Sequence, residues 1–151
     1  MPYRSTLIQG TLFLLRWQEI CPEDIGSSCA QVKAAAAKAG RPILSLWVAP
    51  EHLPTPSGEV RGQMVDQMKV LFQHTEIHHV IEGTSLRTRL LRGFMTNLFV
   101  LSGYSGRMFV YRNVVEALIA MMPRLHRVGV TLVEAQRAAA SARIFTDRED
   151  P

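Results

Sequence analysis

The spacing of hydrophobic residues changes near the start of the chain. Residues 7–8 and 11–17 are rich in residue types that suit a pleated, half-buried surface, and we expect two strands there, joined in a hairpin around Gln9 and Gly10. From Pro22 to Ala39 apolar residues recur at every third or fourth position. This spacing predicts a helix with one narrow buried face, which ends at the glycine that follows.

The middle of the chain continues this alternation of strand and helix. Ile43–Ala49 is a short, almost continuously apolar run between two prolines, which is typical of a strand covered on both faces, and we expect it at the centre of the sheet. A proline-rich loop over residues 51–56 leads into a second helix, whose apolar residues lie on one side over residues 60–72. Residues 77–81 predict another buried strand.

The second half of the chain repeats the same order. Residues 82–103 predict a third helix and Met108–Tyr111 predicts a last short strand. Asn113 has the side chain and the position of a residue that caps a fourth helix. We expect Pro123 to end that helix, because proline interrupts helical hydrogen bonding.

A fifth helix is predicted close to the end of the chain. Thr131 and Glu134 have the spacing of a capping box, and an alanine-rich stretch extends the helix over residues 131–144. Its apolar face consists mostly of small side chains, so it packs closely but buries little. The tail over residues 146–151 is expected to be frayed.

This order of elements predicts the α/β fold class. Alternating strands and helices imply right-handed crossovers and a mostly parallel sheet with packed helices, here opened by an antiparallel hairpin and extended by an extra C-terminal helix. No linker or internal repeat divides the chain, so we expect a single domain over residues 1–145.

The composition is that of an ordinary globular domain. Of the 151 residues, 47% are hydrophobic and 20% are charged, which is enough to bury a core without metal or disulfide support. The start of the chain lacks a secretory signal, and no window reaches about 18 uninterrupted apolar residues, which favours a cytoplasmic protein without a transmembrane segment. The net charge of +4 comes from dispersed arginines, so nucleic acid is not an expected partner. The two cysteines fit no metal or redox spacing.

Two segments resemble a known family. They are ILSLWVAP followed by a helix, and HHVIEGTSLRTRLLRGFMTNLFVLSG followed by RMFVYRNVVEALIAM. Over about residues 5–122 the chain resembles the STAS-like superfamily, and it is most similar to the small bacterial proteins described as SpoIIAA-like. The resemblance implies a non-enzymatic domain without a cofactor, which binds a protein partner as anti-anti-sigma factors do, or an apolar ligand as the CRAL-TRIO lipid-binding relatives do.

The resemblance also draws attention to one serine. In the anti-anti-sigma branch a phosphorylatable serine lies where a central strand passes into a helix, and the matching segment TPSGEV puts Ser57 at that position. Pro56 replaces the polar neighbour found in the family, and the loop is longer and richer in proline. The alternative is that Thr55 or Ser57 caps the following helix.

Residues with catalytic or metal-binding chemistry form no complete motif. His74, His78 and His79 are close in sequence, but the last two alternate along a predicted strand and point to opposite faces, so we expect no metal site. Glu82, at the end of a core strand, is the acid most typical of an active site, and its alternative role is to stabilise the helix that follows. No nucleophile motif accompanies it, and we predict that the chain is not an enzyme.

The predicted third helix changes character along its length. It begins with Arg87, Arg89 and Arg92, for which two roles are open: contact with an acidic partner, or simple solvation. It continues with apolar residues spread around most of its circumference, which one sheet face cannot cover: Phe94, Met95, Leu98, Phe99 and Leu101. Either the fifth helix or the Met121-Met122 end of the fourth helix covers the excess, or these residues form a surface for self-association or a protein partner.

Two functions follow as hypotheses. The first is a STAS-like interaction module, a homodimer or the partner of another protein, that acts in bacterial regulation. The second is a carrier of a small apolar molecule or lipid, whose pocket lies between the sheet and the third helix, near Trp47, Met64 and Met95.

Overall fold

Five strands form one sheet in the order β1-β2-β3-β4-β5. The computed structural model describes residues 2–104 and 106–144. The expected frayed tail over 146–151 lies outside these residues, as does the side chain of Leu98, a member of the expected interaction surface. The strands are β1 (Tyr3–Ile8), β2 (Leu12–Trp17), β3 (Ile43–Ala49), β4 (Thr75–Ile81) and β5 (Met108–Tyr111). β1 and β2 pair antiparallel and β2 to β5 run parallel, which confirms the predicted sheet with Ile43–Ala49 at its centre.

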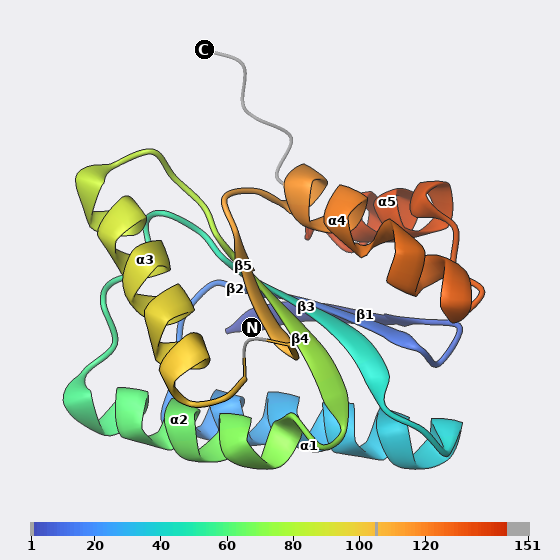
Figure 1. Cartoon of the computed structure of the whole chain (residues 1–151), viewed down its shortest axis with the longest axis horizontal. Helices are drawn as coiled ribbons and strands as arrows, with labels where there is room; N and C mark the ends of the chain where they lie inside the picture. The colour runs from blue at the N-terminus through green and yellow to red at the C-terminus, as the bar shows by residue number, and fades with distance from the viewer. Residues whose placement is uncertain (1, 105, 145–151) are drawn as a thin grey trace.

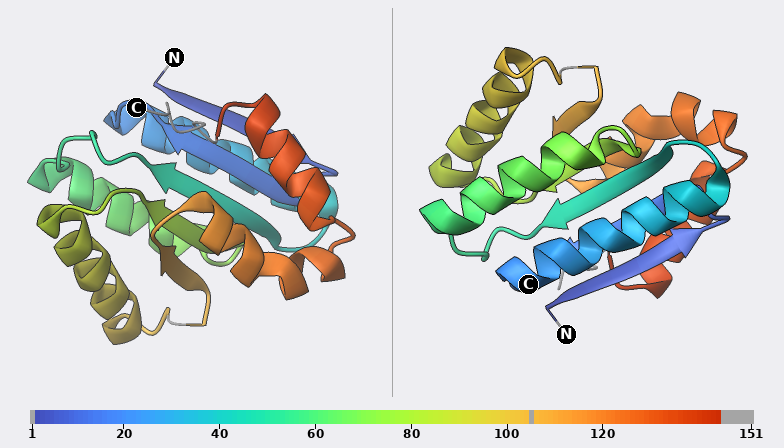
Figure 2. Two further views of the ribbon diagram at one scale, coloured as in Figure 1. Left: turned by 90° about the horizontal axis from the view of Figure 1, so that it is seen from above. Right: turned by 90° about the horizontal axis from the view of Figure 1, so that it is seen from below.

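The helices cover both faces of this sheet (Figures 1 and 2). They are α1 (Pro22–Ala39), α2 (Gly58–Leu71), α3 (Leu86–Leu101), α4 (Val114–Arg127) and α5 (Leu132–Ser141). The first three connect neighbouring parallel strands in sequence order. Because right-handed crossovers that advance in one direction return on the same side, α1, α2 and α3 share one face. α4 and α5 cover the other face.

Alternating side chains of the strands divide the core into two layers. On β3, Leu46 and Val48 pack against the residues of α4 and α5, whereas Trp47 packs on the side of α1, α2 and α3. The Trp47 ring lies 5.9 Å from that of Trp17 and 6.1 Å from that of Phe13, measured between ring centroids. The aromatic residues of the first three strands therefore gather on the face of the crossover helices.

The extra C-terminal helix packs through alanines. Ala135 and Ala139 are fully buried against α4 and β1, and the predicted capping box is present at the helix start. The helix ends at Ser141 and not at residue 144 as predicted. It ends there because Arg143 adopts a left-handed φ of 53° and the N–H of Ile144 donates to the carbonyl of Ala139, which closes the last turn.

Pro123 lies inside α4, so the prediction that it ends this helix is wrong. The helix continues because Met121 and Leu125, buried on either side of the proline, hold both turns against the sheet. It ends at Arg127, and Gly129, two residues on, has a left-handed φ of 76° that lets the N–H of Val130 donate back to the carbonyl of Leu125. Packing thus outweighs the cost of about 3 kcal/mol that proline imposes on a helix interior.

Replacing Pro123 with alanine should raise the free energy of unfolding by about 1–3 kcal/mol, because alanine restores a backbone donor and has the highest helix propensity. The proline is exposed, so little packing is lost. Urea denaturation measures the change. Pro42→Ala, exposed and outside any helix, is the control and should give no gain. A Pro123→Ala protein that is less stable than the wild type would contradict this account of α4.

Candidate functional site

α2 packs mainly on α1, and a cavity lies beside it. Leu71 is the one fully buried residue of α2, whereas α1 buries six. α3 runs in a different direction from α2 and lies against β4 and β5 (Figure 1). Between α2, α3 and the ends of β3 and β4 is an open cavity of about 600 Å³. This volume is in the range of natural ligand pockets, and the carboxyl ends of parallel strands are where open α/β sheets bind ligands.

The wall of this cavity is largely apolar. Both tryptophans of the chain, Trp17 and Trp47, form part of it, and three methionines line it: Met64, Met68 and Met95. The pocket expected from the sequence was near three of these residues, Trp47, Met64 and Met95. Other apolar lining residues are Ile20, Ile25, Cys29, Ala49, Leu53, Val65, Leu71, Ile77, Ile81, Leu91 and Phe94. A surface of this composition suits an apolar molecule.

Two buried polar atoms of residues in this wall have no hydrogen-bond partner in the described part of the chain. They are the indole Nε1 of Trp47 and the imidazole Nε2 of His79. The two residues are register partners on β3 and β4, so their side chains are neighbours on the same face of the sheet. A buried polar atom without a partner costs about 1–3 kcal/mol. This pair therefore marks a candidate binding point within an otherwise apolar wall.

The inner wall is uncharged at neutral pH. Burial lowers the pKa of His79 to about 4, so its imidazole is neutral at pH 7. Burial also raises the pKa of the Cys29 thiol to about 11, which keeps the thiol protonated. The charged lining residues are exposed and form the rim: Glu51, Arg61, Asp66 and Arg87. A molecule held deep in the cavity meets no charged group of the described residues.

Hydrogen bonds fix the start of α3 at this rim. A carboxylate oxygen of Glu51 accepts a bond from the N–H of Ser85 at 3.3 Å. Gly83 makes room for that carboxylate, since its φ is 115° and a Cβ there would lie 2.4 Å from the Glu51 carboxyl carbon. Arg92 donates to the carbonyls of Ile81 and Gly83, at 2.6 and 3.0 Å. The loop after β4 and the first turns of α3 are thereby joined.

The three arginines of the expected basic contact differ in their surroundings. Arg92 is bound to the carbonyls after β4, and Arg87 donates to the carbonyl of Leu53 in the loop after β3. Arg89 is exposed. Two of the three thus hold the cavity rim together, and contact of this group with an acidic partner stays a prediction.

The apolar half of α3 divides between core and surface. Phe99 is 3% exposed and stacks on His79 with 5.6 Å between ring centroids, so it is removed from the expected interaction surface. Phe99 is buried because it packs on β4, over the ring of His79. Met95 and Phe94 both line the cavity, but Phe94 is also 59% exposed, and Leu101 is 86% exposed.

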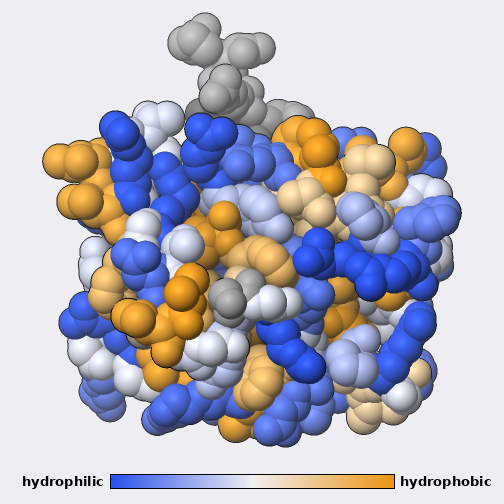
Figure 3. All heavy atoms as spheres, viewed as in Figure 1, coloured by the Kyte–Doolittle hydropathy of each residue, from blue (hydrophilic) through white to orange (hydrophobic). Residues whose placement is uncertain are grey.

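The outer face of α3 has no cover in the described part of the chain. α5 packs on α4 and β1, so the alternative in which the fifth helix covers this face is wrong. Met121 is buried in the layer of α4, on the opposite side of the sheet. Figure 3 shows apolar groups over α3 with hydrophilic side chains beside them. We call the exposed residues along one side of the helix the α3 stripe: Leu86, Leu90, Phe94 and Leu101.

Glu82 forms an ion pair with Arg16 of β2. The two guanidinium nitrogens lie 3.0 and 2.8 Å from its carboxylate oxygens, and Arg16, only 7% exposed, also donates to the carbonyl of Ile144 at 3.1 Å. The carboxylate compensates a buried charge and helps to fix the segment after α5. Neither role considered from the sequence, catalysis or helix stabilisation, anticipated this partner.

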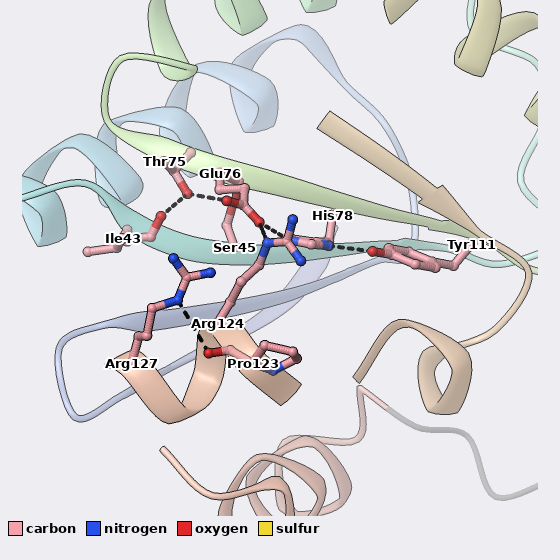
Figure 4. A network of polar contacts seen from close by, with 9 residues as sticks. All are labelled: Ile43, Ser45, Thr75, Glu76, His78, Tyr111, Pro123, Arg124 and Arg127. Atoms are coloured by element: carbon pink, nitrogen blue, oxygen red, sulfur yellow. Dashed lines mark hydrogen bonds and ion pairs between the residues drawn. The ribbon is translucent and has the colours of Figure 1, made fainter. Parts of the chain in front are cut away.

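His78 and His79 point to opposite faces of the sheet, as predicted. On the α4 side, His78 contacts the hydroxyl of Tyr111 at 2.8 Å and the carboxylate of Glu76 at 2.7 Å, and Glu76 pairs with Arg124 of α4 (Figure 4). Burial lowers the pKa of His78, against the opposing effect of Glu76. The network ties β4 to β5 and α4. Nowhere in the described residues do three or more His, Cys, Asp or Glu side chains gather as a metal site.

Ser57 caps α2. Its side-chain oxygen accepts a hydrogen bond from the N–H of Val60 at 3.3 Å, so the capping role considered from the sequence is confirmed for this residue. The serine is exposed at the start of the helix. Its phosphorylation stays a prediction.

No protein-family model matches the chain, and no curated protein matches it. Among the described residues, no helix has the length and apolar character needed to cross a membrane. The cavity and the α3 stripe are the two features of the described chain that bear on its function.

The free energy of unfolding should fall as the pH is lowered from about 6.5 to about 4, in part because of His79. The folded protein keeps this side chain neutral down to a pKa of about 4, whereas the unfolded chain binds the proton near pH 6.5. Above that range both states are neutral and the histidine has no effect. His78, with its lowered pKa, acts in the same direction.

Urea denaturation at a series of pH values measures this fall, and His79→Leu is the diagnostic variant. It should lose less stability than the wild type across the same range, because it has no imidazole to protonate in the unfolded state. Equal losses in the two proteins would show that the histidine is not held neutral by the fold.

Proposed function

We propose that the chain is a non-enzymatic binding protein for a small apolar molecule, held between α2, α3 and the sheet. One observation carries the proposal: an open cavity of about 600 Å³, largely apolar and uncharged within, at the carboxyl ends of parallel strands. The resemblance to STAS-like proteins and their CRAL-TRIO relatives supports a carrier of this kind, acting in the bacterial cytoplasm.

The construction of the wall supports reversible binding. α2 contributes one fully buried residue, so it can shift outward at little cost to the core. The methionines of α2 and α3 are unbranched and flexible, and such side chains adapt to ligands of different shape. Each square ångström of apolar ligand surface removed from water contributes about 25 cal/mol to binding before the cost of association.

Saturable binding of a neutral apolar probe tests this function. Both tryptophans line the cavity, so energy transfer from them to N-phenyl-1-naphthylamine reports occupancy directly. We expect one probe per chain. Met64→Arg should weaken binding at least about tenfold, because it places a charge against the apolar wall.

The matched control is Val133→Arg, which introduces the same charge at an exposed position of α5, on the other face of the sheet. It should bind the probe as the wild type does. Absence of saturable binding, or an equal loss in both variants, would contradict the proposal.

A second candidate function is favoured by the α3 stripe. Four large apolar residues on one side of a helix are between 59% and 86% exposed, which is typical of a contact surface. We propose that this surface mediates self-association into a dimer or contact with a protein partner, as a regulatory interaction module of the STAS-like type would need. The two functions are compatible, because Phe94 is the one member of the α3 stripe that also lines the cavity, and Leu86, Leu90 and Leu101 are not part of its wall.

Sedimentation equilibrium at micromolar concentration tests the second candidate. The wild type should be a dimer, and Leu90→Glu should be a monomer because a charge would be buried in the contact. Val133→Glu provides the same change on α5 and should remain a dimer. Monomeric wild-type protein, or dissociation by both variants, would exclude a dimer formed through the α3 stripe.

A further inference from the structure

We propose that the ligand of this cavity is a neutral molecule with an apolar body and one oxygen, as in a lipophilic alcohol, phenol or ketone, and that this oxygen binds Trp47 and His79. The inference rests on the proposed function and narrows it to a class of ligand. It is carried by two atoms on neighbouring central strands, the indole Nε1 and the imidazole Nε2, which have no hydrogen-bond partner in the described part of the chain.

Trp47 sets the first requirement. It is 7% exposed, it lines the cavity, and its Nε1 is buried without a hydrogen-bond partner among the residues that the structure describes. An indole N–H can only donate, so the group that completes the site must carry an acceptor. Trp17 lines the same cavity, but its Nε1 is not among the buried unpaired atoms of the described residues. The requirement therefore belongs to one of the two tryptophans.

His79 sets the second requirement. Its ring is stacked on Phe99 with an angle of 28° between the planes, and its Nε2 is buried without a hydrogen-bond partner among the described residues. A neutral imidazole has one donor and one acceptor nitrogen. A hydroxyl oxygen accepts from Trp47 and also pairs with Nε2 whichever nitrogen carries the proton. A carbonyl or ether oxygen can only accept hydrogen bonds, so it pairs with both nitrogens only when Nε2 carries the proton.

The charges around the cavity make a neutral ligand the better match. The charged lining residues are exposed at the rim, and Arg87 there is already bound to the carbonyl of Leu53. Burial lowers the pKa of His79, so this side chain offers no positive charge at neutral pH. A carboxylate at the inner wall would be desolvated without a cation to pair with.

The wall must adjust for the oxygen to reach these atoms. Nε1 and Nε2 are closed off from solvent in the structure. Met64, Met68 and Met95 share the wall, and methionine changes its rotamer at low cost. Binding is therefore expected to move methionine side chains and leave β3 and β4 in place.

Titration calorimetry at about pH 8 with 1-decanol, decyl methyl ether and decanoate tests the inference. The three share one apolar chain and differ in the oxygen group, and decanoate is ionised at this pH. We expect 1-decanol to bind at least about tenfold more tightly than decanoate. If decyl methyl ether binds as tightly as 1-decanol, the ligand belongs to the wider class of molecules with a neutral oxygen. If the ether binds more weakly, the ligand carries a hydroxyl group. Both results support the inference.

Trp47→Phe keeps an aromatic ring and removes the donor, so it should weaken 1-decanol binding about five- to tenfold. Trp17→Phe removes an indole from the same cavity and should change the affinity less than about twofold. His79→Leu should also weaken the binding of 1-decanol. If Trp47→Phe does not fold, the comparison of alcohol with carboxylate on the wild type still tests whether the ligand is neutral, and His79→Leu tests the contact with the oxygen.

The possible failures are distinct. Decanoate as tight as 1-decanol, or a folded Trp47→Phe protein with wild-type affinity for the alcohol, overturns the class of ligand and leaves the cavity as a general apolar site. Failure of all three compounds and of N-phenyl-1-naphthylamine to bind overturns both the inference and the proposed function.

Discussion

The parallel order of the sheet constrains where the crossover helices lie, and the cavity follows from that constraint. Right-handed connections from β2 to β5 put α1, α2 and α3 on one face. α1 fills its share of that face with six buried residues, α2 packs on α1, and α3 lies against β4 and β5. The sheet surface between α2 and α3 is left open at the carboxyl ends of the strands, where Trp47 and His79 are neighbours.

The two faces of the sheet differ in a way that suits a binding protein. α4 and α5 close one face with a continuous apolar layer, and polar ties run through it from His78 to Glu76 and Arg124. On the other face, flexible methionines and a lightly buried helix border the cavity. The strands that carry Trp47 and His79 are thus fixed by the packing of α4 and α5 on one face of the sheet. On the other face, the side chains around the cavity can adjust to a ligand.

Local signals were sufficient for most of the fold but only for part of the site. Prolines and glycines mark the ends of α1 and β3, and both bounds agree with the prediction. Pro123 does not end α4, because packing on both sides of the proline keeps the helix intact. The end of α5 was predicted too late, because Arg143 adopts a left-handed φ without being a glycine. Glu82 has its partner in β2, a pairing that no local pattern contains.

The cavity itself could be placed from the sequence, because a strand of apolar residues followed by two amphipathic helices brings Trp47, Met64 and Met95 together. The sequence could not show that His79 Nε2 lacks a partner. This depends on Phe99 of α3, which stacks on the ring, and on the absence of a hydrogen-bond partner for Nε2 among the described residues. Alternation along β4 showed only that this histidine and His78 face opposite ways.

A crystal structure of the complex with 1-decanol tests the central claim most directly. We expect one molecule between α2, α3 and the sheet, with its oxygen about 3 Å from the Trp47 Nε1 atom and the neighbouring methionines in new rotamers. Density for the alcohol on the outer face of α3, or an unoccupied cavity in crystals saturated with it, would contradict the account.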